Sequence, residues 1–285
     1  MLPMSSRSGR VDAHQHFWRY DPAEYPWIDA RMAVIAHDFL PGDLEPLLAD
    51  NGIDRCVAVQ ARQSLEETRF LLDLAANHDF IAGVVGWVDL CADDAETAVH
   101  ELRGESKLVG LRHVLQDEPD DAFCLRGDFR HGVALLADAG LTYDILIHPR
   151  HVVNATKLVD EFREQSFVLD HLAKPYIRDG ILDVWVKQLK DLAILPNVHV
   201  KLSGLVTEAS WGDWKQDDFV PYLDAALDAF GEDRIMFGSD WPVCTLAASY
   251  EAVVDIVTDW AERALSDSAR AKLFSNNAVR FYGLS

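Results

Sequence analysis

Eight short runs rich in β-branched residues recur along the 285-residue chain, and stretches with helical periodicity separate them. Buried parallel strands read as short apolar runs of this kind, whereas amphipathic helices show apolar residues every three or four positions. The sequence therefore predicts a regular alternation of strand and helix. The expected strands cover residues 11–18, 54–60, 81–87, 108–114, 141–148, 166–172, 197–204 and 234–240, and the clearest expected helices cover residues 65–78, 128–140, 181–195 and 217–231.

This alternation favours an α/β fold, namely a single-domain (β/α)8 TIM barrel over residues 1–285. Eight repeats exceed the roughly five to seven strands of a typical open doubly wound sheet, and no glycine-rich phosphate-binding motif follows an expected strand. Residues 266–284 are expected to add one helix that closes the barrel. Residues 1–10 are expected to form a flexible N-terminal segment.

The chain is strongly acidic, with 47 Asp and Glu against 26 Lys and Arg and a formal net charge of −21. This charge repels phosphate backbones and anionic lipid, so it argues against nucleic acid or a membrane as a partner and favours a small-molecule substrate. No apolar run approaches the roughly 20 residues of a membrane span, and the N-terminus lacks a secretory signal. Four scattered cysteines are typical of buried thiols in a reducing compartment. We therefore expect a cytoplasmic protein.

Polar side chains stand near the C-terminal ends of the expected strands, where the active sites of such barrels lie. His14 and His16 are two residues apart on the first strand, so their side chains face the same way and can bind one ion. Together with His171 at the end of the sixth strand and Asp240 at the end of the eighth, they make a set suited to one divalent metal ion, and zinc is the expected ion. The alternative is a metal-free polar cluster in which Asp170 orients His171 as an acid or base.

Further residues near the strand ends are candidates for substrate binding. Aromatic rings offer apolar faces to a sugar ring, and arginine or lysine can donate hydrogen bonds to its hydroxyl groups. His113 is interpreted as a substrate contact or proton donor rather than a metal ligand, and His148 as a pocket residue or a further ligand. The residues expected at the substrate are Arg62, Trp87, Arg112, His148, Lys174, Trp211 and Trp241, with Trp18 near the rim.

The motifs around these residues resemble those of the amidohydrolase superfamily. They include "HQHFWRY" at residues 14–20, "LRHVLQDE" at 111–118, "LDHLAKP" at 169–175, "KLSGLVTEASW" at 201–211 and "MFGSDWPVC" at 236–244. Within the superfamily, the chain is similar to the amidohydrolase-2 lactonases, with its strongest similarity to L-fuconolactonase-type sugar lactone hydrolases. The resemblance implies a (β/α)8 lactone hydrolase with a site for one divalent ion, although some relatives are thought to work without one.

We expect this enzyme to hydrolyse a sugar-acid lactone, such as L-fuconolactone, to the open-chain acid. Asp240 is the expected general base that activates water, and the imidazoles, including His171, polarise the carbonyl together with the metal. The proton on Asp240, or His113, then protonates the leaving oxygen. Two alternatives are an amidohydrolase-2 decarboxylase and an aromatic or muconate-type lactonase for a carboxylated ring. The sequence leaves the lactone stereoisomer and the formation of a homo-oligomer open.

Overall fold

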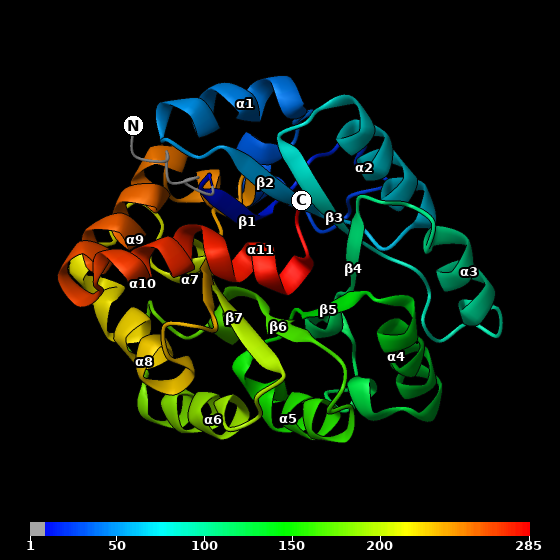
Figure 1. Cartoon of the computed structure of the whole chain (residues 1–285). Helices are drawn as coiled ribbons and strands as arrows, with labels where there is room; N and C mark the ends of the chain where they lie inside the picture. The colour runs from blue at the N-terminus through cyan, green and yellow to red at the C-terminus, as the bar shows by residue number, and fades with distance from the viewer. Residues whose placement is uncertain (1–8) are drawn as a thin grey trace, which may run out of the picture.

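The computed structural model describes residues 9–285, and in this part of the chain eight parallel strands form one sheet. Each strand pairs with the next one along the chain, and Figure 1 shows the strands arranged around a common centre. The last strand returns to the first, because the N–H of His16 donates to the carbonyl oxygen of Trp241 over 2.7 Å. The strands are β1 (Val11–Gln15), β2 (Arg55–Val59), β3 (Ile81–Gly86), β4 (Leu108–His113), β5 (Thr142–Ile145), β6 (Phe167–Leu169), β7 (Val198–Leu202) and β8 (Ile235–Phe237).

Helices lie outside the strands and connect each strand to the next (Figure 1). This arrangement confirms the predicted single-domain (β/α)8 TIM barrel. The α-helices are α1 (Pro41–Asp50), α2 (Leu65–Asn77), α3 (Ala95–Leu102), α4 (Gly127–Ala139), α5 (Val152–Glu161), α6 (Asp183–Ala193), α7 (Leu205–Glu208), α8 (Val220–Phe230), α9 (Tyr250–Ala264), α10 (Asp267–Ala271) and α11 (Asn277–Tyr282).

Polar caps fix where several helices begin and end. Ser64 Oγ accepts a hydrogen bond from the N–H of Glu67 at the start of α2, and Ser249 Oγ accepts one from the N–H of Ala252 at the start of α9. Helix α4 ends at Gly140, whose φ of 71° is a left-handed conformation that glycine adopts without steric cost. The apolar faces of these helices are thereby held over the strands.

The C-terminal region closes one end of the barrel. A π-helical segment over Lys272–Asn276 separates α10 from α11, so the region predicted to be one helix consists of three short helical segments. In Figure 1, α11 crosses the centre of the barrel, and Ala278 packs in a cluster that includes Val11 of β1. Tyr282 Oη donates to a carboxylate oxygen of Asp144 over 2.9 Å. The last helix therefore reaches a charged group in the barrel interior.

Several strands end sooner than the sequence predicts. β5 ends at Ile145 instead of residue 148, β6 at Leu169 instead of residue 172, and β8 at Phe237 instead of residue 240. After β6 the backbone becomes left-handed, and Asp240 also has a φ of 60°, which an extended strand does not allow. The candidate site residues after these strands therefore lie on loops.

The N-terminal segment 1–10, predicted to be flexible, lies outside the described residues except for Gly9 and Arg10. The N–H of Arg10 donates to Asp54 Oδ2 over 2.7 Å, and the carbonyl oxygen of Gly9 accepts a hydrogen bond from Ser275 Oγ over 2.8 Å. Hydrogen bonds therefore hold these two residues to the rest of the fold.

Replacing Ser249 by alanine is expected to lower the free energy of unfolding by about 0.5–2 kcal/mol, because the first turn of α9 loses its side-chain cap. Urea titration monitored by circular dichroism measures this loss. The control is Ser268→Ala, which changes an exposed serine inside α10 and is expected to leave stability nearly unchanged. Equal effects of the two substitutions would contradict the role of the cap.

Candidate active site

Three imidazoles surround the carboxylate of Asp240 beyond the C-terminal ends of the strands. The Nε2 atoms of His16, His171 and His14 lie 3.3, 3.8 and 3.9 Å from Asp240 Oδ1. All four side chains are buried. His14, His16 and Asp240 form one group of side chains that could hold a metal ion, and His171 belongs to a second such group with His14 and Asp170. The residues present therefore fit one divalent metal ion.

The second ring nitrogens of two imidazoles are held by neighbouring groups. His16 Nδ1 donates to the carbonyl oxygen of Val59 over 2.7 Å, so its Nε2 carries the lone pair that faces Asp240. His171 Nδ1 lies 2.9 Å from Ser203 Oγ. Burial lowers the pKa of His171 to about 4, so the ring is neutral near pH 7, as a metal ligand must be.

The carboxyl group of Asp240 is ionised near neutral pH. Burial acts to raise its pKa, but the neighbouring imidazoles, His171 foremost, outweigh this effect and hold the pKa below its ordinary value. An ionised carboxylate at this place can bind a cation or accept a proton from a water molecule. These are the two roles that the sequence predicts for Asp240.

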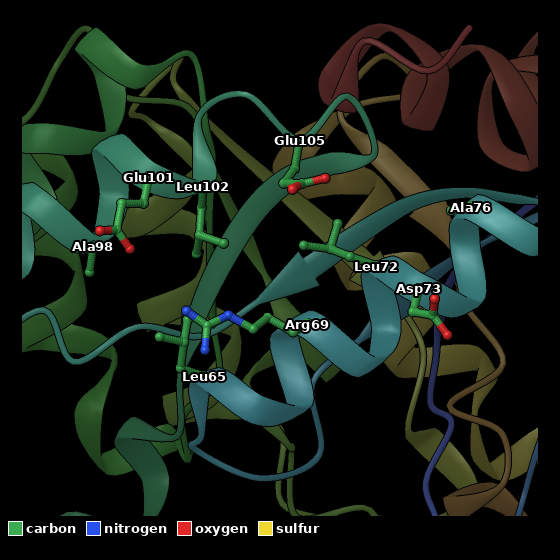
Figure 2. A pocket seen from close by; sticks show the side chains of 9 residues that line it. All are labelled: Leu65, Arg69, Leu72, Asp73, Ala76, Ala98, Glu101, Leu102 and Glu105. Carbon is green, nitrogen blue, oxygen red and sulfur yellow. The ribbon is translucent and has the colours of Figure 1, made fainter.

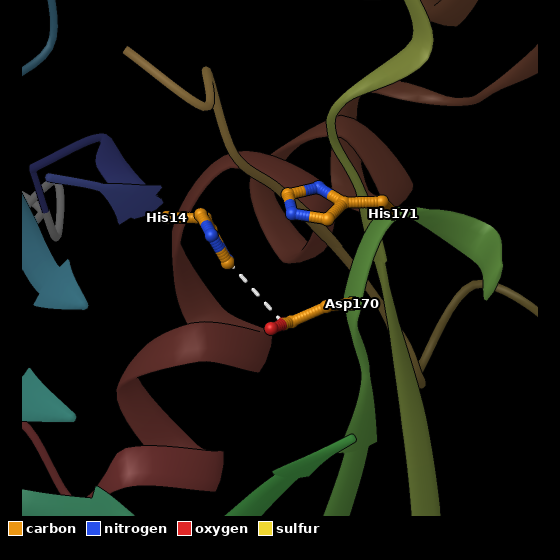
Figure 3. A group of neighbouring side chains, drawn as sticks. All are labelled: His14, Asp170 and His171. Atoms are coloured by element: carbon orange, nitrogen blue, oxygen red, sulfur yellow. Dashed lines mark ion pairs between the residues drawn. The ribbon is translucent and has the colours of Figure 1, made fainter. Parts of the chain in front are cut away.

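A buried ionic network lies beside His14. Its Nδ1 is 3.3 Å from Asp170 Oδ1, the contact drawn in Figure 3. Lys201 Nζ lies 3.0 Å from the same His14 nitrogen and 3.0 Å from Asp170 Oδ1. The Lys201 ammonium also pairs with Asp144 over 2.5 Å, and Arg112 Nη1 donates to Asp170 Oδ2 over 3.0 Å. Two cations thus face two carboxylates, and this pairing is what permits charges inside the barrel.

The backbone is left-handed at four consecutive residues after β6, from His171 to Lys174, with φ between 52° and 59°. Each such residue costs about 1–2 kcal/mol unless its surroundings hold it. The indole N–H of Trp185 donates to the carbonyl oxygen of Leu172 over 2.8 Å. Gly204 lies so close to the His171 ring that a Cβ there would be 2.5 Å from Nδ1. Packing therefore holds this turn, and the turn brings both His171 and Lys174 to one cavity.

A cavity of about 740 Å³ opens at this end of the barrel, and His16, His171 and Asp240 are part of its lining. Its volume is within the range of about 300–1,000 Å³ found for small-molecule sites. The walls combine apolar and charged side chains, which suits a ligand with both C–H and hydroxyl groups. They include Trp27, Met32, Leu146, Val243, Leu246, Arg62, Lys174 and Glu208.

A second hollow, of about 440 Å³, lies between α2 and α3 on the outside of the barrel (Figure 2). Its polar residues are Arg69, Asp73, Glu101 and Glu105. Within residues 9–285, the groups of side chains that could hold a metal ion contain none of these residues. The cavity that contains Asp240 is therefore the candidate active site.

Comparison with known proteins gives the family. Residues 11–284 match the family model described as amidohydrolase. The chain belongs to the amidohydrolase family. It is 47% identical to an L-fucono-1,5-lactonase of Burkholderia multivorans, with 96% of each chain covered. It is 39% identical to an L-fucono-1,5-lactonase of Burkholderia ambifaria, with 96% of this chain and 95% of the relative covered.

A solved structure is similar over almost the whole chain. It is a crystal structure of an amidohydrolase from Burkholderia multivorans with bound zinc, which shares 47% identity and a TM-score of 0.93 and covers 97% of this chain and 99% of that chain. Membership of the amidohydrolase family, together with the cluster of histidines and Asp240, supports a divalent metal ion in this chain.

In the present chain, four of the residues predicted to bind substrate line the cavity. The guanidinium of Arg62 is paired with Glu24, and that of Arg112 with Asp170. No carboxylate of the described residues lies within 4.0 Å of the ammonium of Lys174. The four are Arg62, Arg112, Lys174 and Trp211.

Three other predicted substrate residues, and His113, lie outside the cavity lining. The indole N–H of Trp87 donates to His113 Nδ1 over 3.4 Å, so the neutral His113 ring carries its proton on Nε2 and donates it to Glu118 over 2.6 Å. Glu118, which lines the cavity, therefore connects His113 and Trp87 to it. Trp241 is buried against Phe39. The three residues are Trp87, His148 and Trp241.

The structure also shows residues that the sequence analysis misses or misplaces. Lys201 is one of the polar residues that the sequence places at the end of the seventh strand, but its partner Asp144 in β5 is missed, although a charge in a buried strand is a sequence signal for an ionic partner. Glu208 lines the cavity, but no pattern distinguishes it from an exposed glutamate. Trp18, predicted near the rim, is fully buried and packs against Phe39.

Replacing Gly204 by alanine is expected to lower the free energy of unfolding by more than about 2 kcal/mol, because the new Cβ adds a clash with His171 to the strain of a left-handed residue. The matched control is Gly180→Ala, which has the same left-handed φ but no atom within 4 Å of the new Cβ, and should lose only about 1 kcal/mol. Urea titration compares the two variants. Equal losses would show that the contact with His171 adds nothing.

Proposed function

We propose that this amidohydrolase hydrolyses sugar-acid lactones, such as L-fuconolactone, to the open-chain acids. One observation carries the proposal: an ionised carboxylate, Asp240, is surrounded by three imidazoles in a cavity large enough for a sugar ring. The names of the two Burkholderia relatives, both L-fucono-1,5-lactonases, support this substrate class. Both relatives are named lactonases, so the alternative of a decarboxylase has no support among them.

In the proposed reaction, Asp240 accepts a proton from a water molecule, whose oxygen attacks the carbonyl carbon of the lactone. The neighbouring His16 and His171 orient the carboxylate and the carbonyl oxygen. The bond between the carbonyl carbon and the ring oxygen then breaks, and the proton held by Asp240 passes to that oxygen. His113 is a poorer proton donor for this step, because its Nε2 proton is already donated to Glu118.

The proposed metal ligands are His14, His16, His171 and Asp240, and zinc is the proposed ion. When bound, such an ion acts as a Lewis acid that polarises the carbonyl and lowers the pKa of water. The similar amidohydrolase of Burkholderia multivorans, whose crystal structure contains bound zinc, supports this choice.

The charges in the cavity favour a neutral lactone over a carboxylated one. Arg62 and Arg112 are already neutralised by Glu24 and Asp170, so neither is free to bind a substrate carboxylate. Glu208 adds a further negative charge to the lining. Lys174 is unpaired, but Glu208 in the same lining offsets its charge, so a ring that carries a carboxylate finds no excess of positive charge there, which disfavours the aromatic or muconate-type substrate.

Cellular location and assembly belong to the same proposal. The four cysteines are free thiols, which supports the reducing cytoplasm as the proposed compartment. Within the described residues, the helices include none with the length and apolar character needed to cross a bilayer. The proposed partner is the lactone substrate, and homo-oligomer formation stays a prediction from the sequence.

The proposed function predicts acid release from neutral 1,4- and 1,5-aldonolactones without release of CO2. Lactones that carry a ring carboxylate should be hydrolysed with a kcat/KM at least about 10-fold lower, because both arginines of the cavity are paired and Glu208 offsets the charge of Lys174. A pH-indicator assay over a panel of lactones measures both rates. If none of the sugar lactones releases acid, the proposed function is wrong.

The substitution Asp240→Asn should reduce kcat by about 10²- to 10⁴-fold, because the amide cannot accept the proton of the attacking water. The control is Asp117→Asn, which neutralises an exposed carboxylate in the same cavity and should keep most of the activity. Circular dichroism checks that both variants are folded. Normal turnover in Asp240→Asn would refute the role of this residue.

Metal analysis tests the proposed zinc site directly. The purified protein should hold about one zinc ion per chain, and zinc added after dialysis against a chelator should raise the Tm. The substitution His16→Asn should reduce both effects. Absence of bound metal, together with a Tm that does not respond to zinc, would show that the cluster works as a metal-free set of hydrogen-bonding groups.

A further inference from the structure

Lys174 and Glu208 are oppositely charged side chains that line the cavity without a protein partner. Within residues 9–285, neither the ammonium nor the carboxylate takes part in a side-chain hydrogen bond or in an ion pair within 4.0 Å. The other two cations of the cavity, Arg62 and Arg112, are each paired with a carboxylate. In the described part of the chain, Lys174 is therefore the cavity cation that is left for a ligand.

Leaving these two charges unpaired is costly, because both are partly withdrawn from water. Burial raises the pKa of Glu208, while the Lys174 ammonium opposes that shift. Both groups are open to the cavity, where water satisfies them until a ligand with matching hydrogen-bonding groups takes its place. An ammonium and a carboxylate that face one cavity can together bind a hydroxyl group, which both accepts and donates a hydrogen bond.

The chain holds both residues close to the reacting centre. Lys174 ends the left-handed turn that begins at His171, so the imidazole and the ammonium are three residues apart on one rigid segment. Glu208 ends α7, the short helix that starts directly after Gly204, and Gly204 is packed against the His171 ring. Glu208 and Asp240 line the same cavity, and the charge of Asp240 adds to the rise in the pKa of Glu208.

We propose that Glu208 and Lys174 form a hydroxyl-binding pair for the hydroxyl group on the carbon next to the lactone carbonyl. In this pair, Glu208 accepts the hydroxyl proton and Lys174 donates to the hydroxyl oxygen. The inference rests on the proposed lactonase function and names the part of the substrate that these residues recognise. Both residues are specificity determinants that touch the substrate.

The position of the pair selects this hydroxyl over the others. The carbonyl carbon must lie beside Asp240, where the water attacks, and the hydroxyl on the adjacent carbon is the one nearest to it. The other hydroxyl groups are separated from the carbonyl carbon by more bonds, so they lie farther from Asp240. Aldonolactones other than the 2-deoxy compounds carry a hydroxyl on this carbon, so the pair would recognise the class rather than one stereoisomer of the distant carbons.

The test compares an aldonolactone with its 2-deoxy analogue, which has the same ring but lacks this hydroxyl. The wild-type protein should prefer the parent lactone in kcat/KM by about 10- to 100-fold, as expected for a hydrogen bond to charged groups. Glu208→Leu and Lys174→Met should each reduce this preference by about fivefold or more, and the double variant should show almost none. Glu208→Gln, which keeps an acceptor oxygen, should restore part of the preference lost in Glu208→Leu.

The ratio between the two lactones separates recognition from a structural role. A variant that merely disturbs the fold lowers kcat/KM for both lactones and keeps their ratio, and that result for Glu208→Leu or Lys174→Met would overturn the inference. If Glu208→Leu does not fold, the ratio in Lys174→Met decides alone. The charge control is Glu105→Gln in the hollow between α2 and α3, which should keep the wild-type ratio (Figure 2).

The same measurement distinguishes failure of this inference from failure of the proposed function. A wild-type protein that hydrolyses neither lactone refutes the lactonase proposal and the pair with it. A wild-type protein that hydrolyses both lactones equally well leaves the lactonase proposal intact and refutes only the role of Glu208 and Lys174.

Discussion

The ion pairs beside His14 are the interaction on which the site depends. Lys201, Asp170, Asp144 and Arg112 come from β7, the end of β6, β5 and β4, so one set of charges ties four neighbouring strands to His14 on β1. Removing one partner of such a pair leaves an uncompensated charge and typically costs about 3–5 kcal/mol. An apolar core would avoid this cost but would have no group with which to orient His14.

Loops give the site its geometry, while the strands only bring the loops together. The left-handed turn at His171 and the left-handed Asp240 are conformations that a free peptide rarely adopts. They persist because tightly packed neighbours, such as Gly204 and Trp185, leave no room for alternatives. A binding or catalytic group must be held within about 0.5 Å, and here a backbone under strain provides this precision.

The sequence predicts the barrel because strand-like apolar runs alternate with segments of helical periodicity along the chain. It predicts His14, His16, His171 and Asp240 as a group because the C-terminal ends of the strands converge in a barrel. The sequence does not show which buried side chains form ion pairs with one another. Nothing in the sequence shows that Arg112 faces Asp170 or that the backbone turns left-handed after β6. Aromatic residues near strand ends are also ambiguous, since packing alone decides that Trp241 and Trp18 belong to the interior.

The hydrogen bond between Tyr282 and Asp144 can form only late in the synthesis of the chain. Asp144 belongs to the charged network beside His14, and its hydroxyl partner comes from the last helix of the fold. During synthesis, the strands that carry His14, Asp144 and Lys201 leave the ribosome well before α11 does. The network therefore lacks the hydrogen bond of Tyr282 until the last helix has been made.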